Sequence, residues 1–473
     1  MLMSSNSREI ATEVQFGFLP AKKTEREFGF WDFLFIQVGF GIAAWCFLVG
    51  GLTGMTLNAK DSIAAILFGN AFPVFLIIPI AIYFARYGVE TFIGFRSALG
   101  YLGSDTFYVL FSILNLGWIT ISCFMIGESA IKIAALFQVG EFWTSREGGA
   151  PIFSFIAFVL SLYIAYKGPN AIKWFTRIGV PSIMLIVVGL IVIIFFKEGI
   201  AKVFSLAPKQ PYDTFARTMA TAIEWNVGLG FSWLPYIGIS SRLTVNEKTA
   251  YSGGFWGFGV LLNVAAILGA LTALLVGSTD PTDWMISFGG TSWGIVGLLL
   301  LILANTTSAV VLMYSQALSF KTLFPSKKWI WAIATTFPAA FLMLSPDFYD
   351  AYSKFLAFIS FIMAVYSGIV IADYFFVKKQ RILVRDLYRR GGAYKYWHGF
   401  NPASVVSFIV STIFYWGVYN PIADEATTLF SYISAGIPTF FVALLVHYVC
   451  AKYLFKLDQE LHSNIRDGVK SHG

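Results

Sequence analysis

The sequence predicts an all-α integral membrane protein with twelve transmembrane helices. Of its 473 residues, 57% are hydrophobic and only 12% are charged, and the mean hydropathy is +0.71. Soluble proteins are about half apolar and about a quarter charged, so this composition excludes a soluble domain. Twelve apolar stretches are long enough to cross about 30 Å of hydrocarbon. Two of them are interrupted at their middles by glycine and proline, at equivalent places in two successive halves of the chain.

The twelve spans follow one another as a single transmembrane domain without linkers. Most connections are short, and the exceptions are the stretches 197–215 and 378–401. In chain order, the predicted spans are 32–53, 62–85, 106–137, 151–167, 175–196, 216–238, 252–277, 292–316, 329–345, 353–377, 402–421 and 427–455.

The distribution of charge predicts the orientation of these spans. Cytoplasmic loops of membrane proteins carry an excess of Lys and Arg. With both termini inside, most of the 33 Lys and Arg residues fall in inner segments, above all in the cytoplasmic loop 378–401. We therefore expect a multi-pass protein of the cell (inner or plasma) membrane with cytoplasmic tails at 1–29 and 456–473. The net charge of +7 reflects this bias and does not indicate a nucleic-acid partner. No signal peptide is expected, because the first 29 residues lack an apolar segment with a cleavage site.

The two interrupted spans predict the position of a binding site. Residues 43–51 of the first span read Ala-Ala-Trp-Cys-Phe-Leu-Val-Gly-Gly, and residues 228–235 of the sixth read Gly-Leu-Gly-Phe-Ser-Trp-Leu-Pro. Unwound backbone is tolerated in a bilayer only where it is buried in protein or lines a cavity. A matched pair of broken helices marks the binding site of a secondary transporter. We expect spans 1–5 and 6–10 to form two inverted repeats in a ten-helix core (30–377), followed by helices 11 and 12 (402–455).

Other functional classes lack their sequence features. The chain has no phosphate-binding loop, serine-hydrolase elbow or zinc-protease motif, so it is predicted not to be an enzyme and to need no cofactor beyond a coupling ion. The three cysteines lack CxxC spacing and are expected to be buried thiols, and the four scattered histidines suggest no metal cluster. A channel would need a continuous polar pore and oligomeric symmetry, whereas we expect a monomer.

Several stretches resemble the nucleobase:cation symporter-1 family, which includes purine-cytosine and hydantoin permeases. Residues 371–377 (Ile-Ala-Asp-Tyr-Phe-Phe-Val), with Asp-Leu-Tyr at 386–388 and Gly-Phe-Asn-Pro at 399–402, resemble the family's connection between helices ten and eleven. Four further matches are Gly-Gly-Leu-Thr at 50–53, Arg-Ser-Ala-Leu-Gly at 96–100, Leu-Gly-Trp at 116–118 and Ser-Trp-Leu-Pro at 232–235.

The resemblance covers roughly residues 28–450, and it implies the fold of sodium-coupled amino-acid and hydantoin transporters. It also implies alternating access and uptake of a small heterocycle together with Na⁺ or H⁺. The expected cargo is a nucleobase or a related compound: a purine, a pyrimidine, a hydantoin, allantoin or a thiamine precursor.

A planar heterocycle is held well between aromatic faces, because offset stacking adds about 0.5–1.5 kcal/mol beyond area burial. The resemblance makes Trp118 one of these faces. Ser122 lies one turn further along the same helix face and offers a single hydroxyl. For the second face, the sixth span offers Phe231 and Trp233, and the sequence leaves the choice open. The remaining candidate substrate-binding residues are Trp45 and Asn305.

Span eight has the spacing of the sodium site in this fold. Residues 304–308 read Ala-Asn-Thr-Thr-Ser, which places a carbonyl first and two hydroxyls three and four residues later. A hard cation such as Na⁺ prefers oxygen ligands. The expected ligands are the Thr307 and Ser308 hydroxyls, together with carbonyls at Ala304 and, from the first break, near Ala44 and Phe47. The alternative is that the hydroxyls only bond back to carbonyls of their own helix.

Two departures from the family leave the cargo open. The family usually supplies an Asn after the hydroxyl pair, but residues 309–313 read Ala-Val-Val-Leu-Met. Ile239 stands where the family usually has an Asp. Asn305 and Gln316 are the remaining amides of span eight. An amino acid or amine is therefore the alternative cargo in the same fold, and a channel or membrane-embedded enzyme is a remote alternative.

Charged residues inside a membrane are costly and suggest function. Glu128 and Lys132 lie one turn apart in span three, in the favourable order, and Glu224 lies in the outer half of span six. We predict that the three form an ion network of the outward gate, with Glu224 alternatively a proton carrier. A static ion pair is the competing interpretation. A second network is predicted to fix the inner end, from Asp373, Arg385, Asp386, Arg389 and Arg390.

Overall fold

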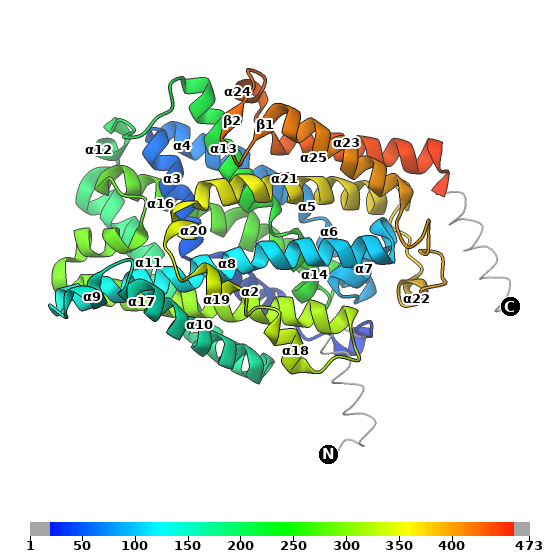
Figure 1. Cartoon of the computed structure of the whole chain (residues 1–473), viewed down its shortest axis with the longest axis horizontal. Helices are drawn as coiled ribbons and strands as arrows, with labels where there is room; N and C mark the ends of the chain where they lie inside the picture. The colour runs from blue at the N-terminus through cyan, green and yellow to red at the C-terminus, as the bar shows by residue number, and fades with distance from the viewer. Residues whose placement is uncertain (1–18, 458–473) are drawn as a thin grey trace, which may run out of the picture.

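The computed structural model describes residues 19–457, except for the side chains of 169–174 and 176. Long helices lie side by side in one bundle (Figure 1). The predicted tails fall largely outside the described residues. We call the end of the bundle that holds α7 (Thr91–Leu99) and α22 (Val384–Leu387) the terminal end, because both ends of the described chain lie there, and we call the opposite end the distal end.

The described residues agree with the predicted number of spans. Eight helices are long and apolar enough to cross a membrane, and a bent pair near the N-terminus makes a ninth. Two shorter apolar helices, Trp329–Leu342 and Pro402–Val418, and the pair formed by the sixth predicted span occupy the remaining places. The predicted class, an all-α membrane protein, is therefore confirmed, and the described helices can be assigned to the twelve predicted spans.

The first five spans contain short irregular turns as well as α-helices. After a 3₁₀ turn, η1 (Lys23–Glu25), the elements are α2 (Phe30–Gly41), α3 (Ala44–Thr56), α4 (Ala59–Ile66), η2 (Leu67–Ala71), α5 (Phe72–Ile77), α6 (Ile80–Tyr87), α7, α8 (Tyr101–Leu136), α9 (Glu141–Thr144), α10 (Gly149–Lys167), α11 (Pro169–Val192), η3 (Ile193–Gly199) and α12 (Ile200–Ser205). The segments η2 and η3 are π-helical turns within spans two and five.

The next five spans also begin with a broken span. They comprise α13 (Phe215–Phe231), α14 (Leu234–Ser241), α15 (Glu247–Gly254), η4 (Phe255–Leu261), α16 (Leu262–Val276), α17 (Pro281–Leu323), α18 (Trp329–Ala334), α19 (Ala339–Leu342), α20 (Asp347–Asp350), α21 (Tyr352–Ile371) and η5 (Ala372–Val377). Helix α17 consists of two helices joined at Gly290, whose φ of 58° is not helical. The predicted span eight, 292–316, lies within the second of them.

The last two spans follow α22. They consist of α23 (Pro402–Val418), a small hairpin of β1 (Tyr419–Asn420) and β2 (Glu425–Ala426), α24 (Phe430–Ile433), α25 (Gly436–Val449) and η6 (Cys450–Leu454). Figure 1 shows α8 along the middle of the bundle, with α21 on one side and α17 and α10 on the other.

The first span is broken, but earlier than predicted. Helices α2 and α3 meet at an angle of 56°, and the unwound residues are Ile42 and Ala43. Residues 44–51 are helical. Gly50 serves close helix packing instead, since a Cβ atom there would lie 2.0 Å from the carbonyl oxygen of Ala266 in α16. The prediction that the glycines unwind this span was therefore wrong in position.

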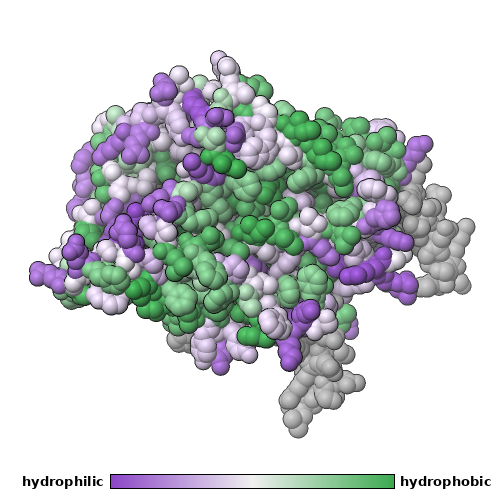
Figure 2. All heavy atoms as spheres, in the orientation of Figure 1, coloured by the Kyte–Doolittle hydropathy of each residue, from purple (hydrophilic) through white to green (hydrophobic). Residues whose placement is uncertain are grey.

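The second break lies within the predicted range. Helix α13 ends at Phe231 and α14 begins at Leu234, with Ser232 and Trp233 between them. Pro235 has no N–H, so it cannot bond to the carbonyl of Phe231 four residues earlier. Figure 2 shows hydrophobic residues across the middle of the visible face, with hydrophilic residues gathered towards its left and right ends, as expected for a protein that crosses a bilayer.

Candidate functional site

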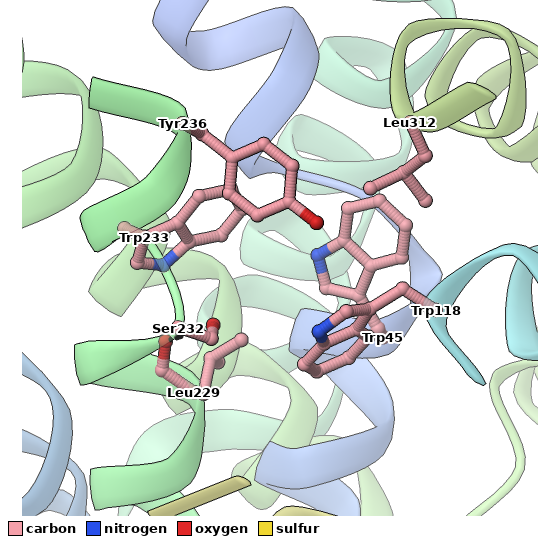
Figure 3. Close-up of a pocket in the computed structure, with 7 residues that line it drawn as sticks. All are labelled: Trp45, Trp118, Leu229, Ser232, Trp233, Tyr236 and Leu312. Atoms are coloured by element: carbon pink, nitrogen blue, oxygen red, sulfur yellow. Dashed lines mark hydrogen bonds between the residues drawn. The ribbon is translucent and has the colours of Figure 1, made fainter. Parts of the chain in front are cut away.

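A cavity lies between the two broken spans. It is lined by Trp45, Trp118, Leu229, Ser232, Trp233, Tyr236 and Leu312. In Figure 3 the residues from the sixth span, Leu229 to Tyr236, stand opposite the two tryptophans of α3 and α8, with Leu312 of α17 at one edge. Each of the seven side chains is at most 5% exposed. The cavity is therefore lined by buried side chains, at the point where a broken-helix transporter would hold its substrate.

The cavity is almost closed. Its volume is about 10 Å³, which is about the room that a single water molecule needs. A heterocycle would therefore have to separate the tryptophans before it could enter. The rings of Trp45 and Trp118 meet edge to face with centroids 5.7 Å apart.

Three of the predicted substrate-binding residues line this cavity: Trp45, Trp118 and Trp233. Trp118 also packs edge to face against Phe355 of α21, at 5.2 Å. The indole of Trp233 is stacked on Phe258 at 4.4 Å, which fixes the orientation of its ring. Of the two aromatic residues that the sequence left open in the sixth span, the structure places Trp233 at the cavity.

The other three predicted substrate-binding residues lie elsewhere. Phe231 is fully buried and is stacked on Phe440 of α25 at 5.2 Å, so its ring points away from the cavity. The Ser122 hydroxyl donates to the carbonyl of Trp118 within α8, at 2.8 Å. The Asn305 side-chain oxygen accepts from the backbone N–H of Ala44, at 3.4 Å. None of the three is among the cavity-lining residues of the described structure.

Four lining residues were missed by the sequence reasoning: Leu229, Ser232, Tyr236 and Leu312. Three of them flank the second break, so the break itself was a usable signal. Tyr236 lies one helical turn after Trp233 and therefore shares its face of the span. Leu312 is one turn beyond Ser308, but it lies among similar apolar residues, so the sequence did not single it out.

The predicted cation ligands of α17 lie close to the first break. Helix α3 begins beside them, since Ala44 donates its N–H to Asn305. The hydroxyl of Ser308 is fully buried and has no hydrogen-bond partner among the described residues. Thr307 donates its proton to the carbonyl of Leu303 at 3.0 Å, which leaves its oxygen lone pairs available. Ala304 is 3% exposed, so the three residues form a buried oxygen-bearing stretch.

The first break does not free the carbonyls that were predicted. Ala44 and Phe47 lie in the first turn of α3, where the backbone offers N–H groups rather than carbonyls. A Cβ atom on Gly269 would lie 2.5 Å from the carbonyl oxygen of Phe47, so this carbonyl faces α16. The free carbonyls belong to the end of α2, where Gly41 already accepts from the indole N–H of Trp45 at 3.2 Å. Any backbone ligand from span one would therefore come from α2 or Ile42.

Glu224 lies apart from the predicted outward gate. Its carboxylate is fully buried and accepts from five groups on three other helices or their caps: the hydroxyls of Ser360, Tyr415 and Ser434, and the backbone N–H groups of Ala435 and Gly436. The two backbone groups can only donate, and they form the N-terminus of α25, which favours an anion. Glu224 therefore joins α13 to spans ten, eleven and twelve, and no ion pair to Glu224 is formed by a residue that the structure describes.

Glu128 and Lys132 do not pair with each other. Glu128 is 2% exposed and forms an ion pair with Arg146, which also contacts Asp350 at 3.0 Å. Lys132 forms an ion pair with Asp283 and lies 3.6 Å from Asp280. These pairs connect α8 to the residues that precede α10 and α21 and to the start of α17, all at the distal end. The prediction of a direct pair between Glu128 and Lys132, linked to Glu224, was wrong. Glu128 and Lys132 do each form an ion pair, but with other residues.

The network predicted at the terminal end has different members. Asp373 forms an ion pair with Lys378 and lies 3.3 Å from Nε2 of His447. Lys378 also donates to the carbonyl of Ser97 in α7, at 2.9 Å. Burial lowers the pKa of the Lys378 ammonium, and the adjacent Asp373 carboxylate opposes that shift. Asp386 instead accepts from the backbone N–H of Ala393 at 3.4 Å.

The comparisons with known proteins agree with this architecture. Residues 20–437 match a family described as permeases for cytosine/purines, uracil, thiamine and allantoin. The chain is 24% identical to a hydantoin permease of Microbacterium maritypicum, with 83% of this chain and 82% of that protein covered. It is 22% identical to an allantoin permease of Bacillus subtilis, with 76% and 78% covered.

A solved structure supports the fold. The chain superposes with a TM-score of 0.74 and 20% sequence identity on Mhp1, a nucleobase-cation-symport-1 family transporter in a closed conformation with bromovinylhydantoin bound. The match covers 93% of this chain and 95% of that one.

Proposed function

Because the chain belongs to the family of permeases for cytosine/purines, uracil, thiamine and allantoin, we propose that it takes up a nucleobase or a related small heterocycle together with Na⁺. The protein is a multi-pass membrane transporter and not an enzyme. The proposed mechanism is alternating access, in which the substrate site between the two broken spans opens to one side of the membrane at a time.

The observation that carries this proposal is the cavity beside both breaks, which is lined by buried aromatic side chains. Three tryptophans and one tyrosine supply flat apolar faces, and no charged side chain is among the seven lining residues. A neutral planar ring gains from stacking in such a site. An amino acid would place its ammonium and carboxylate groups against seven lining residues that include no ionic partner, which is unfavourable.

Sodium coupling is supported by the oxygen atoms of α17. The unpartnered, buried hydroxyl of Ser308 would lose nothing by binding a cation, and Thr307 can contribute lone pairs while it donates to Leu303. The Ala304 carbonyl and the free carbonyls at the end of α2 would complete an oxygen site suited to Na⁺. Proton coupling through Glu224 is less favourable, because its two backbone partners at α25 require an acceptor.

The proposed orientation follows from the charge distribution. Loop 378–401 is rich in Lys and Arg and lies at the terminal end, so we assign that end to the cytoplasm. The distal end, with its ion pairs around Arg146 and Lys132, then faces outward. We further propose a cell-membrane location and a monomeric working unit.

The test is thermal unfolding of the purified protein with a panel of ligands, in Na⁺ buffer and in choline buffer. The panel contains purines, pyrimidines, hydantoins, allantoin, thiamine precursors, amino acids and amines. We expect at least one heterocycle to raise the unfolding temperature, and to do so more in Na⁺ than in choline, since only the folded state binds. Stabilisation by amino acids or amines alone would overturn the cargo proposal, and equal shifts in both buffers would overturn sodium coupling.

Two variants locate the binding site. Trp118→Ala removes one aromatic wall of the cavity and should abolish the ligand-dependent shift. Trp293→Ala is the matched control, because that tryptophan is 75% exposed on the surface of α17. A heterocycle that stabilises both variants equally would bind elsewhere.

A further inference from the structure

One lining residue of the cavity begins a chain of buried hydrogen bonds. The hydroxyl of Tyr236 donates to the side-chain oxygen of Asn115 in α8, at 2.6 Å. The amide nitrogen of Asn115 donates in turn to the side-chain oxygen of Gln316, at 2.8 Å, and to the backbone carbonyl of Leu312, at 3.1 Å. Asn115 and Gln316 are fully buried and Tyr236 is 4% exposed, so these bonds are shielded from water.

The far end of this chain determines its direction. The amide nitrogen of Gln316 donates to the backbone carbonyl of Thr335, at 2.9 Å, and lies 3.2 Å from the Thr335 hydroxyl. That hydroxyl uses its own proton on the carbonyl of Ala332, at 2.6 Å. A backbone carbonyl can only accept, so the nitrogen of Gln316 must face Thr335 and its oxygen must face Asn115.

The same reasoning orients Asn115. Its nitrogen faces two acceptors, the Leu312 carbonyl and the Gln316 oxygen, and therefore its oxygen faces Tyr236. A flip of either amide would place oxygen against oxygen at a buried position, which is costly. The Tyr236 hydroxyl has one proton, and that proton is used on Asn115. Towards the cavity, Tyr236 can offer only oxygen lone pairs.

We propose that Tyr236 is a specificity-determining residue that accepts a hydrogen bond from an N–H group of the substrate, with Asn115 and Gln316 as the positioning residues. This inference rests on the proposed function. It assigns the polar recognition of the substrate to α14 and α8, whereas residues 309–313 of α17 are apolar.

The Tyr236 ring is well placed for this role. It meets Phe40 edge to face at 4.8 Å and Phe111 at 5.2 Å, so its hydroxyl cannot swing away from Asn115 without displacing both rings. A second lining residue, Trp233, carries a hydrogen-bond donor. The indole N–H of Trp233 is buried and has no hydrogen-bond partner among the described residues. The two groups together fit a lactam-type heterocycle, which carries an N–H donor and a carbonyl acceptor.

The test combines a protein change with a ligand change. Binding of uracil, hydantoin and hypoxanthine, and of their derivatives methylated at each ring nitrogen in turn, is measured in Na⁺ for the wild type and for Tyr236→Phe. For the wild type, methylation of one particular nitrogen should weaken binding about tenfold or more, because a buried acceptor loses its donor. In Tyr236→Phe the unmethylated compound should bind more weakly than it does to the wild type. The ratio of the affinity for the unmethylated compound to the affinity for the methylated one should therefore fall towards one.

Two further variants make the result specific. Tyr83→Phe is the matched control, since it also removes a buried hydroxyl, whose partner is the carbonyl of Gly94 at 2.8 Å. This variant should keep the wild-type ratio. Asn115→Leu should also lower the ratio, because it releases the Tyr236 proton and lets the hydroxyl donate into the cavity.

The outcomes separate the inference from the proposed function. If no heterocycle binds the wild type, the proposed function fails and the inference fails with it. If the unmethylated compounds bind but Tyr236→Phe keeps the wild-type ratio for every methylated nitrogen, the inference alone is overturned. The inference would also be overturned if Tyr83→Phe lowered this affinity ratio as much as Tyr236→Phe does.

Discussion

Substitution of Glu224 tests whether its carboxylate carries protons or stabilises the fold. The sequence allows a gate or proton carrier at this position. The structure instead gives its carboxylate five hydrogen-bond donors, two of which are backbone N–H groups at the N-terminus of α25. The informative substitution is Glu224→Gln, which keeps the shape of the side chain and removes its charge and its titration.

The expected loss of stability follows from these contacts. In the variant, the remaining oxygen can still accept from Ser434, Ala435 and Gly436, but three charge-assisted bonds become neutral ones. Each such change costs about 1 kcal/mol. The new amide nitrogen faces Ser360 and Tyr415, whose hydroxyls can rotate to accept; Tyr415 also lies 2.7 Å from the Ala357 carbonyl. We therefore expect a loss of about 2–4 kcal/mol in the free energy of unfolding.

The assay is thermal unfolding together with uptake into proteoliposomes. Glu224→Gln should unfold at a lower temperature than the wild type, yet keep sodium-driven uptake of the stabilising heterocycle and its pH profile. Glu247→Gln is the matched control, because that carboxylate is 42% exposed in its ion pair with Arg86. This pair is bidentate but partly exposed to solvent, so the control should lose less stability than Glu224→Gln and should also keep uptake.

One result would refute the reasoning. If Glu224→Gln unfolded like the wild type but lost the pH dependence of uptake, the carboxylate would be a proton carrier and not a structural anchor.

Three further predictions follow from other contacts. Ser308→Ala should not lower the stability in choline, because the hydroxyl has no partner, but it should reduce the extra stabilisation by Na⁺; an unchanged Na⁺ effect would exclude this hydroxyl as a ligand. Gly179→Ala should weaken the Na⁺ effect and the fold, because its Cβ would lie 2.0 Å from Oγ1 of Thr307; a variant indistinguishable from wild type in both would contradict this packing. Arg146→Met should lower the unfolding temperature by leaving the buried Glu128 unpaired, and no change would show that the ion pair contributes nothing.

The site was only partly predictable from the sequence. Trp118 and Trp45 were identified through a motif and a break, and both line the cavity. Phe231 and Trp233 are two residues apart in the same break, and no pattern in the sequence tells which ring faces inward. Helix rotation decides this, since Phe231 turns towards α25 and Trp233 towards the cavity.

The ionic contacts could not be predicted for a similar reason. Glu128 and Lys132 are correctly spaced for a pair along one helix, but each finds a partner from another segment, Arg146 and Asp283 respectively. The spacing of two charged residues along a helix shows only that they can form an ion pair. It does not show whether a residue of a neighbouring segment lies closer to either of them.

The sequence by itself determined the membrane class, the family and the presence of two broken spans, although the first break lies earlier than its glycines indicate. These properties depend on local composition, on the thickness of a bilayer and on short motifs. Only the tertiary structure decided which side chains meet at the cavity, that the Tyr236 hydroxyl donates to Asn115, and that Glu224 accepts from the N-terminus of α25. The physical reason is that lipid and protein interior are both apolar. Helices in such a bundle are therefore apolar on most faces, and hydrophobic periodicity does not reveal which face a residue presents to its neighbours.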